Sequence, residues 1–209
     1  IRLLMADVQQ NMEQIILDVA EELFLDKGYA LTSTTEIAKK AGCNQALIHY
    51  YFRTKENLFQ KLFEAKFIQF ATAIDPSKFR GLPFEEKLKF VISNHIEMVA
   101  KNKKLPFLIL SEINTNPERF SKVALKIKEL SFPILIELTI DLDNEIKAGR
   151  IRQIDPIQLL INIVSLNVFM FLAKPIVEKV AGLNNENFKE FVEARKVEVF
   201  EVIWRSLRI

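Results

Sequence analysis

A short stretch, residues 41–52, gathers many of the side chains in this sequence that could recognise another molecule. It reads AGCNQALIHYYF, so small residues and a glycine lead into two amides, a histidine and two tyrosines. A glutamine amide can make two hydrogen bonds to adenine, and an alanine can touch a thymine methyl group. Histidine can donate or accept a hydrogen bond, and tyrosine hydroxyls can bond phosphate oxygens. These groups suit the base edges and backbone of double-stranded DNA.

The spacing around this stretch predicts a helix-turn-helix over residues 34–53. Ala38 is small where two helices must approach closely, Gly42 follows in the turn, and Ile48 points back into the junction. The second helix of such a unit enters the major groove with its N-terminal residues against base edges. The other inward positions are expected to be Ile37, Cys43 and Phe52.

The side chains left on the outer face divide by expected role. Base edges are expected to meet Gln45, Ala46 and His49. Contacts with the DNA backbone are expected from Thr34, Thr35, Tyr50, Tyr51 and Lys55. Asn44, the expected N-cap of the second helix, completes the predicted DNA-binding set.

A structural explanation of the same pattern stays open at this point. Helix–glycine–helix junctions occur in many helical proteins, and adjacent tyrosines are often packing residues. The formal charge of the whole chain is only +2, which does not by itself indicate a nucleic-acid binder. The charge is nevertheless concentrated locally, because residues 37–61 hold five basic side chains and one acidic one.

Capping signals divide the first 73 residues into four expected helices. The first should end at Gly28, and Ser33 with Glu36 forms a capping box for the second. Asn44 should begin the third helix and Thr54 the fourth. We expect a domain boundary within the fourth helix, which gives an N-terminal domain over residues 1–65 and a C-terminal domain over residues 66–209.

The rest of the chain also predicts helices, so the expected fold class is all-α. Two prolines, Pro133 and Pro175, lie inside helical patterns and should kink or interrupt them. The expected helices cover residues 84–101, 105–114, 117–148, 156–180 and 187–207.

About 45 residues of the N-terminal part resemble the DNA-binding domain of the tetracycline-repressor (TetR) family of transcriptional regulators. The matching landmarks are Ala20, Leu23, Phe24, Gly28, Tyr29, Thr32, Ile37, Ala38, Ala41, Gly42, Ile48, Tyr50, Phe52, Lys55, Glu56 and Leu58. The resemblance implies an N-terminal three-helix helix-turn-helix domain joined to a larger C-terminal helical domain for ligand binding and dimerisation. It also implies a regulator, more often a repressor, that binds a palindromic operator as a dimer.

The resemblance assigns roles to individual positions. Gln45, Ala46 and His49 take base-reading positions, and Thr35 stands where some members contact a base. Phosphate-contacting positions fall on Thr34, Tyr50 and Lys55. Three residues depart from the family pattern. His49 stands where tyrosine is usual, Tyr51 where histidine is frequent, and Leu47 replaces a small polar residue. These departures affect the operator sequence that is read.

The expected partners are operator DNA, a second copy of the chain and a small apolar effector that releases the protein from DNA. Helices 156–180 and 187–207 carry excess apolar surface and are expected to form a homodimer as a four-helix bundle. Effector-binding candidates lie among aromatic and polar residues of the C-terminal domain: Phe90, Asn94, Met98, Phe107, Phe120, Phe132 and Phe169.

Composition indicates a cytoplasmic protein outside the membrane. The chain has one cysteine, Cys43, which excludes an internal disulfide and fits a reducing compartment. Residues 156–173 are long enough to span a membrane, but a polar stripe of Gln158, Asn162 and Ser165 favours a buried or interface helix. The start of the sequence lacks the apolar core of a signal peptide.

Two other function classes remain as alternatives. A helical enzyme would use Cys43, His49 or His95, but these residues form no coherent acid–base set and match no zinc spacing. We therefore expect no catalytic site, metal or cofactor. A helical small-molecule carrier or scaffold with a vestigial helix-turn-helix is the stronger alternative, since the overall charge is low.

Overall fold

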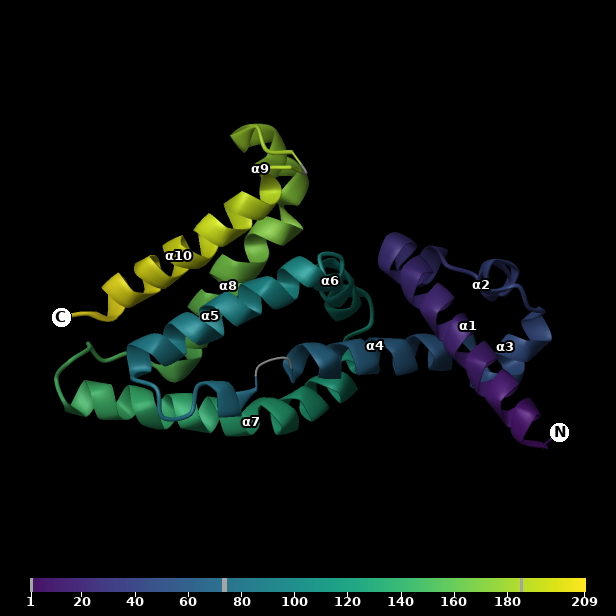
Figure 1. Cartoon of the computed structure of the whole chain (residues 1–209), viewed down its shortest axis with the longest axis horizontal. Helices are drawn as coiled ribbons and strands as arrows, with labels where there is room; N and C mark the ends of the chain where they lie inside the picture. Colours follow the sequence, from purple (N-terminus) through teal and green to yellow (C-terminus); the bar gives the residue numbers. More distant parts are fainter. Residues whose placement is uncertain (1, 73–74, 185) are drawn as a thin grey trace. The chain divides into compact units, whose positions relative to one another are not determined.

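The computed structural model describes residues 2–72, 75–184 and 186–209 (Figure 1). Within these residues the regular secondary structure is helical, apart from one isolated bridge between Ile151 and Arg208. The all-α prediction is therefore confirmed. Contacts divide the chain into two units, each described by itself below. Unit 1 holds residues 1–69 and 108–124, and unit 2 holds residues 70–107 and 125–209.

Unit 1 contains the helices expected from the capping signals. They are α1 (Arg2–Leu31), α2 (Thr34–Ala41), α3 (Gln45–Phe52) and α4 (Lys55–Ala71). The helical geometry of α1 is interrupted at Gly28, which has φ 75° and ψ 175°. α2 lies against both α1 and α3, as the right-hand part of Figure 1 shows. The expected three-helix arrangement is thus present.

Side-chain caps begin α2, α3 and α4 where the sequence predicts them. Ser33 Oγ accepts a hydrogen bond from the Glu36 N–H at 3.1 Å. Asn44 Oδ1 accepts one from the Leu47 N–H at 2.9 Å, and Thr54 Oγ1 accepts one from the Asn57 N–H at 3.0 Å. Gly42 ends α2 in the left-handed conformation, with φ 68° and ψ 28°. A residue with a Cβ is disfavoured there, which explains the glycine in the turn.

A shared apolar core fixes α1, α2, α3 and α4. Phe59 is 1% exposed, and its ring meets Phe24 edge to face at 4.8 Å and stacks on Phe63 at 5.6 Å between centroids. Most of the expected junction residues are buried beside them, including Ile37, Ala38, Ile48 and Phe52. Cys43 is only half-buried, so it contributes less to this core than expected.

The second segment of unit 1 is anchored by one buried arginine. It consists of most of α6 (Leu105–Thr115) and the first turns of α7 (Pro117–Lys147). Arg119 is 5% exposed, and it donates to Glu112 and to Glu56 at 2.8 Å each. Its guanidinium lies 4.5 Å from the centroid of the Tyr29 ring and 4.8 Å from that of Phe59. The domain boundary expected near residues 65–66 stays a prediction. That prediction did not group residues 108–124 with the N-terminal helices, as the contacts do.

Unit 2 is built from the remaining helices and one apolar core. α5 (Phe84–Lys101), α8 (Pro156–Leu172) and α10 (Phe188–Leu207) contact one another, and their ribbons run side by side in Figure 1. The unit also holds α9 (Lys174–Ala181), a short 3-10 turn (Pro76–Lys78), the remainder of α7 and the ends of α4 and α6 that lie outside unit 1. Its fully buried core residues include Ile92, Ile96, Val99, Val199 and Leu207.

The segment expected over residues 156–180 forms two helices, so the predicted interruption at Pro175 is confirmed. α8 and α9 meet at a bend of 74°. Pro175 cannot donate a backbone hydrogen bond and its ring crowds the preceding turn, which accounts for the break. Pro133, in contrast, does not interrupt α7. No single helix in the described part of the chain is long and apolar enough to span a membrane, whereas α8 and α9 together would meet that test.

The Arg119 ion pairs predict a large effect of one substitution on stability. Burial raises the pKa of Glu112, and the Arg119 charge opposes that rise. Arg119→Ala leaves Glu112 buried without its partner, so we expect the free energy of unfolding to fall by about 3–5 kcal/mol in urea titrations. Arg205→Ala is the control, because Arg205 is exposed and pairs with Glu201 on the surface of α10. Its expected cost is below about 0.5 kcal/mol. Equal losses for both variants would contradict this account.

Candidate nucleic-acid interface

α3 has one buried face and one exposed face, as expected for a recognition helix. Ile48 and Phe52 are 1% and 4% exposed and pack inward. The three predicted base-reading side chains, Gln45, Ala46 and His49, are all exposed. Asn44 and Tyr50 are exposed as well, whereas Tyr51 is half-buried and meets the Tyr50 ring edge to face at 5.1 Å. Tyr51 is therefore partly a packing residue.

Two threonines of α2 hold the amide of Gln45. Gln45 Nε2 donates to Thr34 Oγ1 at 2.9 Å, and Thr35 Oγ1 donates to Gln45 Oε1 at 3.4 Å. The amide keeps one N–H and one lone pair beyond these bonds. The sequence placed all three residues at the interface, but it gave no signal that α2 would orient the first side chain of α3.

A tight turn joins α3 to α4 and involves His49. Arg53 has φ 66° and ψ −51°, a rarely populated conformation for a residue with a side chain. The Thr54 N–H donates to the Phe52 carbonyl oxygen at 2.8 Å across it. His49 Nδ1 lies 2.7 Å from the Arg53 carbonyl oxygen. The exposed imidazole is thus tied to the turn, and sequence patterns alone did not indicate this contact.

Lys55 is the first residue of α4 and packs on α1. Its Nζ lies 4.2 Å from the centroid of the Tyr29 ring, a cation–π arrangement. Burial lowers the pKa of Lys55, and the Arg119 charge contributes in the same direction. Its position as the first residue of α4 also puts it at a helix N-terminus. Helix N-termini attract anions, so this position suits a DNA phosphate.

Acidic residues of α1 neutralise part of the local positive charge. Lys40 pairs with Glu22 and Lys61 pairs with Glu13, each at 2.6 Å. These pairs are largely exposed, so each contributes little to stability. Phosphates of DNA can compete with these carboxylates for the lysines. These two lysines therefore remain available to DNA at a small energetic cost.

The residues considered for catalysis do not form an active site. Burial raises the pKa of the Cys43 thiol, which disfavours the nucleophilic thiolate. His95 lies in the other unit, where burial lowers its pKa to about 4, and its Nδ1 accepts a hydrogen bond from Asn167 Nδ2 at 3.0 Å. In the described part of the chain, no cluster of three His, Cys, Asp or Glu residues could bind a metal ion.

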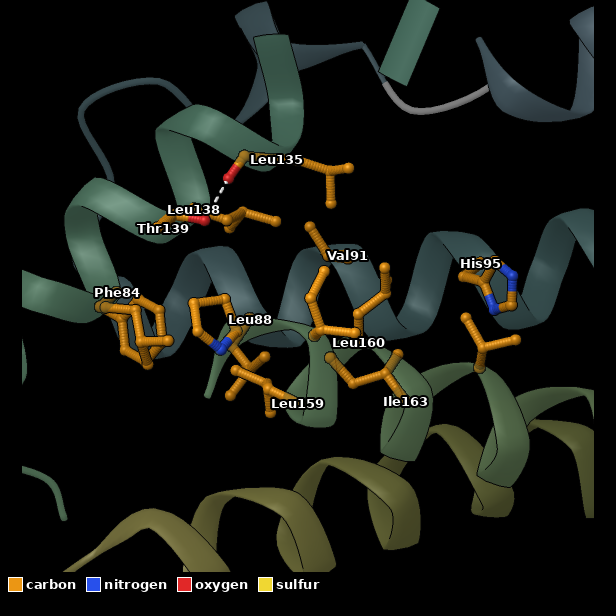
Figure 2. A pocket seen from close by; sticks show the side chains of 14 residues that line it. Phe84, Leu88, Val91, His95, Leu135, Leu138, Thr139, Leu159, Leu160 and Ile163 are labelled. Carbon is orange, nitrogen blue, oxygen red and sulfur yellow. Dashed lines mark hydrogen bonds between the residues drawn. The ribbon is translucent and has the colours of Figure 1, made fainter. Parts of the chain in front are cut away.

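Unit 2 contains an apolar cavity of about 140 Å³ between α5, α7 and α8. Figure 2 shows Val91 of α5 facing Leu160 and Ile163 of α8, with Phe84 near one end and His95 at the other. The remaining lining residues are Leu88, Leu135, Leu138, Thr139, Leu142, Pro156, Ile157, Leu159 and Val164. The Thr139 hydroxyl donates to the Leu135 carbonyl oxygen at 2.7 Å, so the wall offers few free polar groups.

Six of the seven predicted effector residues have described side chains, and these lie outside the cavity lining; the role of all seven remains untested. Phe107 and Phe169 are 66% and 67% exposed. Phe90 packs against Phe79, Phe120 packs against Phe67, and Asn94 donates to the Phe90 carbonyl oxygen. Met98 is buried, and the side chain of Phe132 lies outside the described ones. None of the six described side chains lines the cavity.

A helical spacing in α5 could have indicated the cavity. Phe84, Leu88, Val91 and His95 recur at the intervals of one helix face and all line it. Composition instead favoured the phenylalanines of the C-terminal domain, together with Asn94 and Met98. Aromatic side chains dominate many ligand pockets, but here branched aliphatic residues form most of the wall.

Lys87 fixes the helix on one side of this cavity to its neighbour. It is 5% exposed, and its Nζ donates to Asp141 at 2.7 Å and to Glu137 at 3.0 Å, both on α7. Burial alone would lower the pKa of Lys87, but these hydrogen bonds raise it above its ordinary value. The ammonium group therefore stays charged and keeps α5 and α7 together beside the cavity.

The fold and the exposed face of α3 define a helix-turn-helix DNA-binding protein. Residues 16–62 match the family model described as bacterial regulatory proteins, tetR family. The chain is 29% identical over 138 residues to the fatty acid metabolism regulator protein of Bacillus subtilis (strain 168), covering 66% of this chain and 70% of that protein.

Solved structures share the fold over nearly the whole chain. A TetR family transcription regulator from Marinobacter aquaeolei VT8 matches with a TM-score of 0.68 and 17% identity, over 97% of this chain and 98% of that one. The transcriptional regulator FadR from Bacillus subtilis, in complex with stearoyl-CoA, matches with a TM-score of 0.64 and 23% identity, over 93% and 98%. Residues 16–62 thus form a domain of the tetR family of bacterial regulatory proteins. The chain is a DNA-binding transcriptional regulator and not an enzyme.

Two substitutions separate the expected base contact from the expected phosphate contact. Gln45→Ala should cost about 1–3 kcal/mol of binding free energy and relax specificity at one or two base pairs. Lys55→Ala should weaken binding to all sequences alike and reduce the salt slope by about one. Fluorescence anisotropy across a salt series, on operator and scrambled DNA, measures both. Identical behaviour of the two variants would show that these roles are wrongly assigned.

Proposed function

We propose that this chain is a ligand-responsive transcriptional repressor that binds a palindromic operator as a homodimer. The observation that carries this proposal is the exposed face of α3, where Gln45, Ala46 and His49 stand on a fully packed helix-turn-helix core. A carrier or scaffold would have no need to hold an exposed glutamine amide in place with two threonines. The tetR-family domain of the chain also favours regulation over transport.

The dimer would form through α8 and α10. Exposed apolar side chains on α8 include Ile161 at 49% and Phe169 at 67%, and those on α10 include Val197 at 60% and Val202 at 45%. Such a surface is costly to leave in water. Two helices from each copy would give a four-helix bundle, and two copies of α3 must then meet half-sites about 34–36 Å apart.

The effector would be an apolar small molecule with an acyl chain, bound in the cavity of unit 2. The cavity wall is almost entirely aliphatic, which suits a hydrocarbon chain. The fatty acid regulator and the stearoyl-CoA complex among the similar proteins support this choice of ligand class. The cavity is smaller than typical ligand pockets of roughly 300–1,000 Å³. An acyl chain would therefore have to move α5, α7 or α8 apart.

This need for expansion supplies the physical basis of the switch. A ligand shifts a conformational equilibrium only by its difference in affinity for the two states. An acyl chain fits an expanded cavity better than the present one, so it would favour an expanded unit 2. α7 contributes residues to both units, with Arg119 in unit 1 and the cavity-lining Leu135 and Leu138 in unit 2. Displacement of this helix is a route by which the effector could reduce DNA affinity.

Binding assays against promoter DNA from the neighbourhood of the gene test the proposed function. A repressor should bind one site at nanomolar concentration, with a steep decrease in affinity as salt rises. A long-chain acyl-CoA should weaken that binding. Equally weak, micromolar binding to every sequence would instead support a carrier. Native mass spectrometry of the purified protein can identify an acyl compound that co-purifies.

Filling the cavity should remove the response to ligand but leave DNA binding intact. Val91→Trp places an indole in the cavity from α5, at a cost in unfolding free energy of about 1–3 kcal/mol. We expect this variant to bind operator DNA normally and to ignore acyl-CoA in the same anisotropy assay. Phe90→Trp is the matched control, since Phe90 is the neighbouring residue and packs on Phe79 instead. A wild-type response of Val91→Trp would rule out this cavity as the effector site.

Charges on the exposed apolar faces of α8 and α10 should separate the dimer. Phe169→Glu with Val197→Glu buries four carboxylates per dimer if the interface is assigned correctly, so we expect a monomer by sedimentation velocity at micromolar concentration. Leu125→Glu is the control, because Leu125 is 66% exposed but lies on α7. A wild-type monomer, or a double variant that stays dimeric, would contradict the proposed interface.

A further inference from the structure

The hydrogen bond of His49 determines which of its two ring nitrogens carries a proton. Nδ1 lies 2.7 Å from the backbone carbonyl oxygen of Arg53. A carbonyl oxygen has no hydrogen to donate, so Nδ1 must be the donor. In a neutral imidazole the other nitrogen, Nε2, is then an acceptor. His49 is exposed on α3, so this acceptor belongs to the face expected to enter the major groove.

The oxygen that accepts the hydrogen bond from His49 Nδ1 belongs to the backbone of the turn, so this bond does not depend on any other side chain. Arg53 has φ 66°, outside the conformations usual for a residue with a side chain, and it directly follows the last residue of α3. Its N–H donates to the His49 carbonyl oxygen at 3.0 Å, while its own carbonyl oxygen receives the imidazole N–H. His49 and Arg53 are therefore joined by two hydrogen bonds in opposite directions. This geometry holds the ring in one tautomer before DNA arrives.

A fixed acceptor distinguishes between the bases of a major groove. Adenine presents its N6 amino group there and cytosine its N4 amino group, and both donate hydrogen bonds. Guanine presents O6 and N7, and thymine presents O4, all of which are acceptors. A neutral Nε2 placed against guanine or thymine would set two lone pairs against each other. It should therefore favour amino bases over keto bases.

We propose that His49 determines operator specificity by accepting a hydrogen bond, through Nε2, from the exocyclic amino group of an adenine or a cytosine. The inference rests on the proposed function, because it needs a DNA operator. It adds that His49 is the hydrogen-bond acceptor in one contact with DNA, and that this contact selects an amino base. Gln45 lies one helical turn earlier on the same face and can read a different base pair through its own amide.

The tautomer can be tested without DNA. The chain has two histidines, and their hydrogen bonds require opposite tautomers. His95 Nδ1 accepts from Asn167 Nδ2, so the proton of neutral His95 is on Nε2. Long-range ¹H–¹⁵N spectra at mildly alkaline pH should show one ring of each kind, and His49→Gln should remove the Nδ1–H form. If His49 has its proton on Nε2, the proposal is overturned, whatever the protein binds.

The base preference is tested with operators randomised at each position. Wild-type protein should favour an amino base over a keto base roughly 5-fold at one position of each half-site, as expected for one net hydrogen bond. The frequencies of adenine and of cytosine among the bound operators, taken separately, show which amino base is read. His49→Ala should lose the preference at that position only. Gln45→Ala is the matched control and should change a different position.

The sharpest comparison replaces the hydrogen-bond acceptor at position 49 with a hydrogen-bond donor. His49→Lys replaces the acceptor by a donor, so it should favour guanine or thymine at the same position. His49→Asn can still accept from adenine and should retain a preference for an amino base there. The inference is overturned if His49→Ala binds specifically with an unchanged base preference, or if the wild-type protein prefers a keto base at this position. Either result leaves the proposed function standing. Absence of any sequence-specific binding by the wild-type protein overturns the proposed function as well.

Discussion

The close packing of α2 on α3 determines which side chains of this protein can reach DNA. Ala38 and Ile48 are almost fully buried at that contact, and Gly42 turns the chain between the helices with a positive φ. Because one face of α3 is fixed in this way, Gln45, Ala46 and His49 on the opposite face stay exposed to solvent. Core packing thus places Gln45 and His49 on the exposed face, and their hydrogen bonds to α2 and to the Arg53 carbonyl oxygen orient the two side chains.

Local rules predicted the N-terminal helices well, because their boundaries are set by nearby residues. Ser33, Asn44 and Thr54 each cap a helix through a backbone N–H three positions later, and such short-range hydrogen bonds can be recognised from sequence. The bend at Pro175 also follows from local chemistry, and the sequence predicted that this proline would kink or interrupt its helix. Whether a proline kinks, breaks or is accommodated, as in α7, depends on the surrounding contacts.

The details that matter for binding were harder to predict, because they join residues that are distant in sequence. The contact of Thr34 with Gln45 depends on the angle at which α2 and α3 cross. The cavity depends on which face of α5 turns toward α7 and α8, and composition favoured phenylalanines such as Phe107 that the structure leaves exposed. Arg119 reaches Glu56 across 63 positions of chain, and no local pattern distinguishes it from a surface arginine.

Cys43 gives this protein a chemical reporter that needs no engineering. It is the only cysteine of the chain, it is half-buried, and it stands immediately before the cap of α3. Burial raises the pKa of its thiol, so alkylating reagents should react slowly while the two helices stay packed. The rate of thiol labelling is therefore sensitive to how closely the residues around this junction are packed. Operator DNA lies across this junction in the proposed complex, so protection of a single sulfur atom would report occupancy of the site in real time.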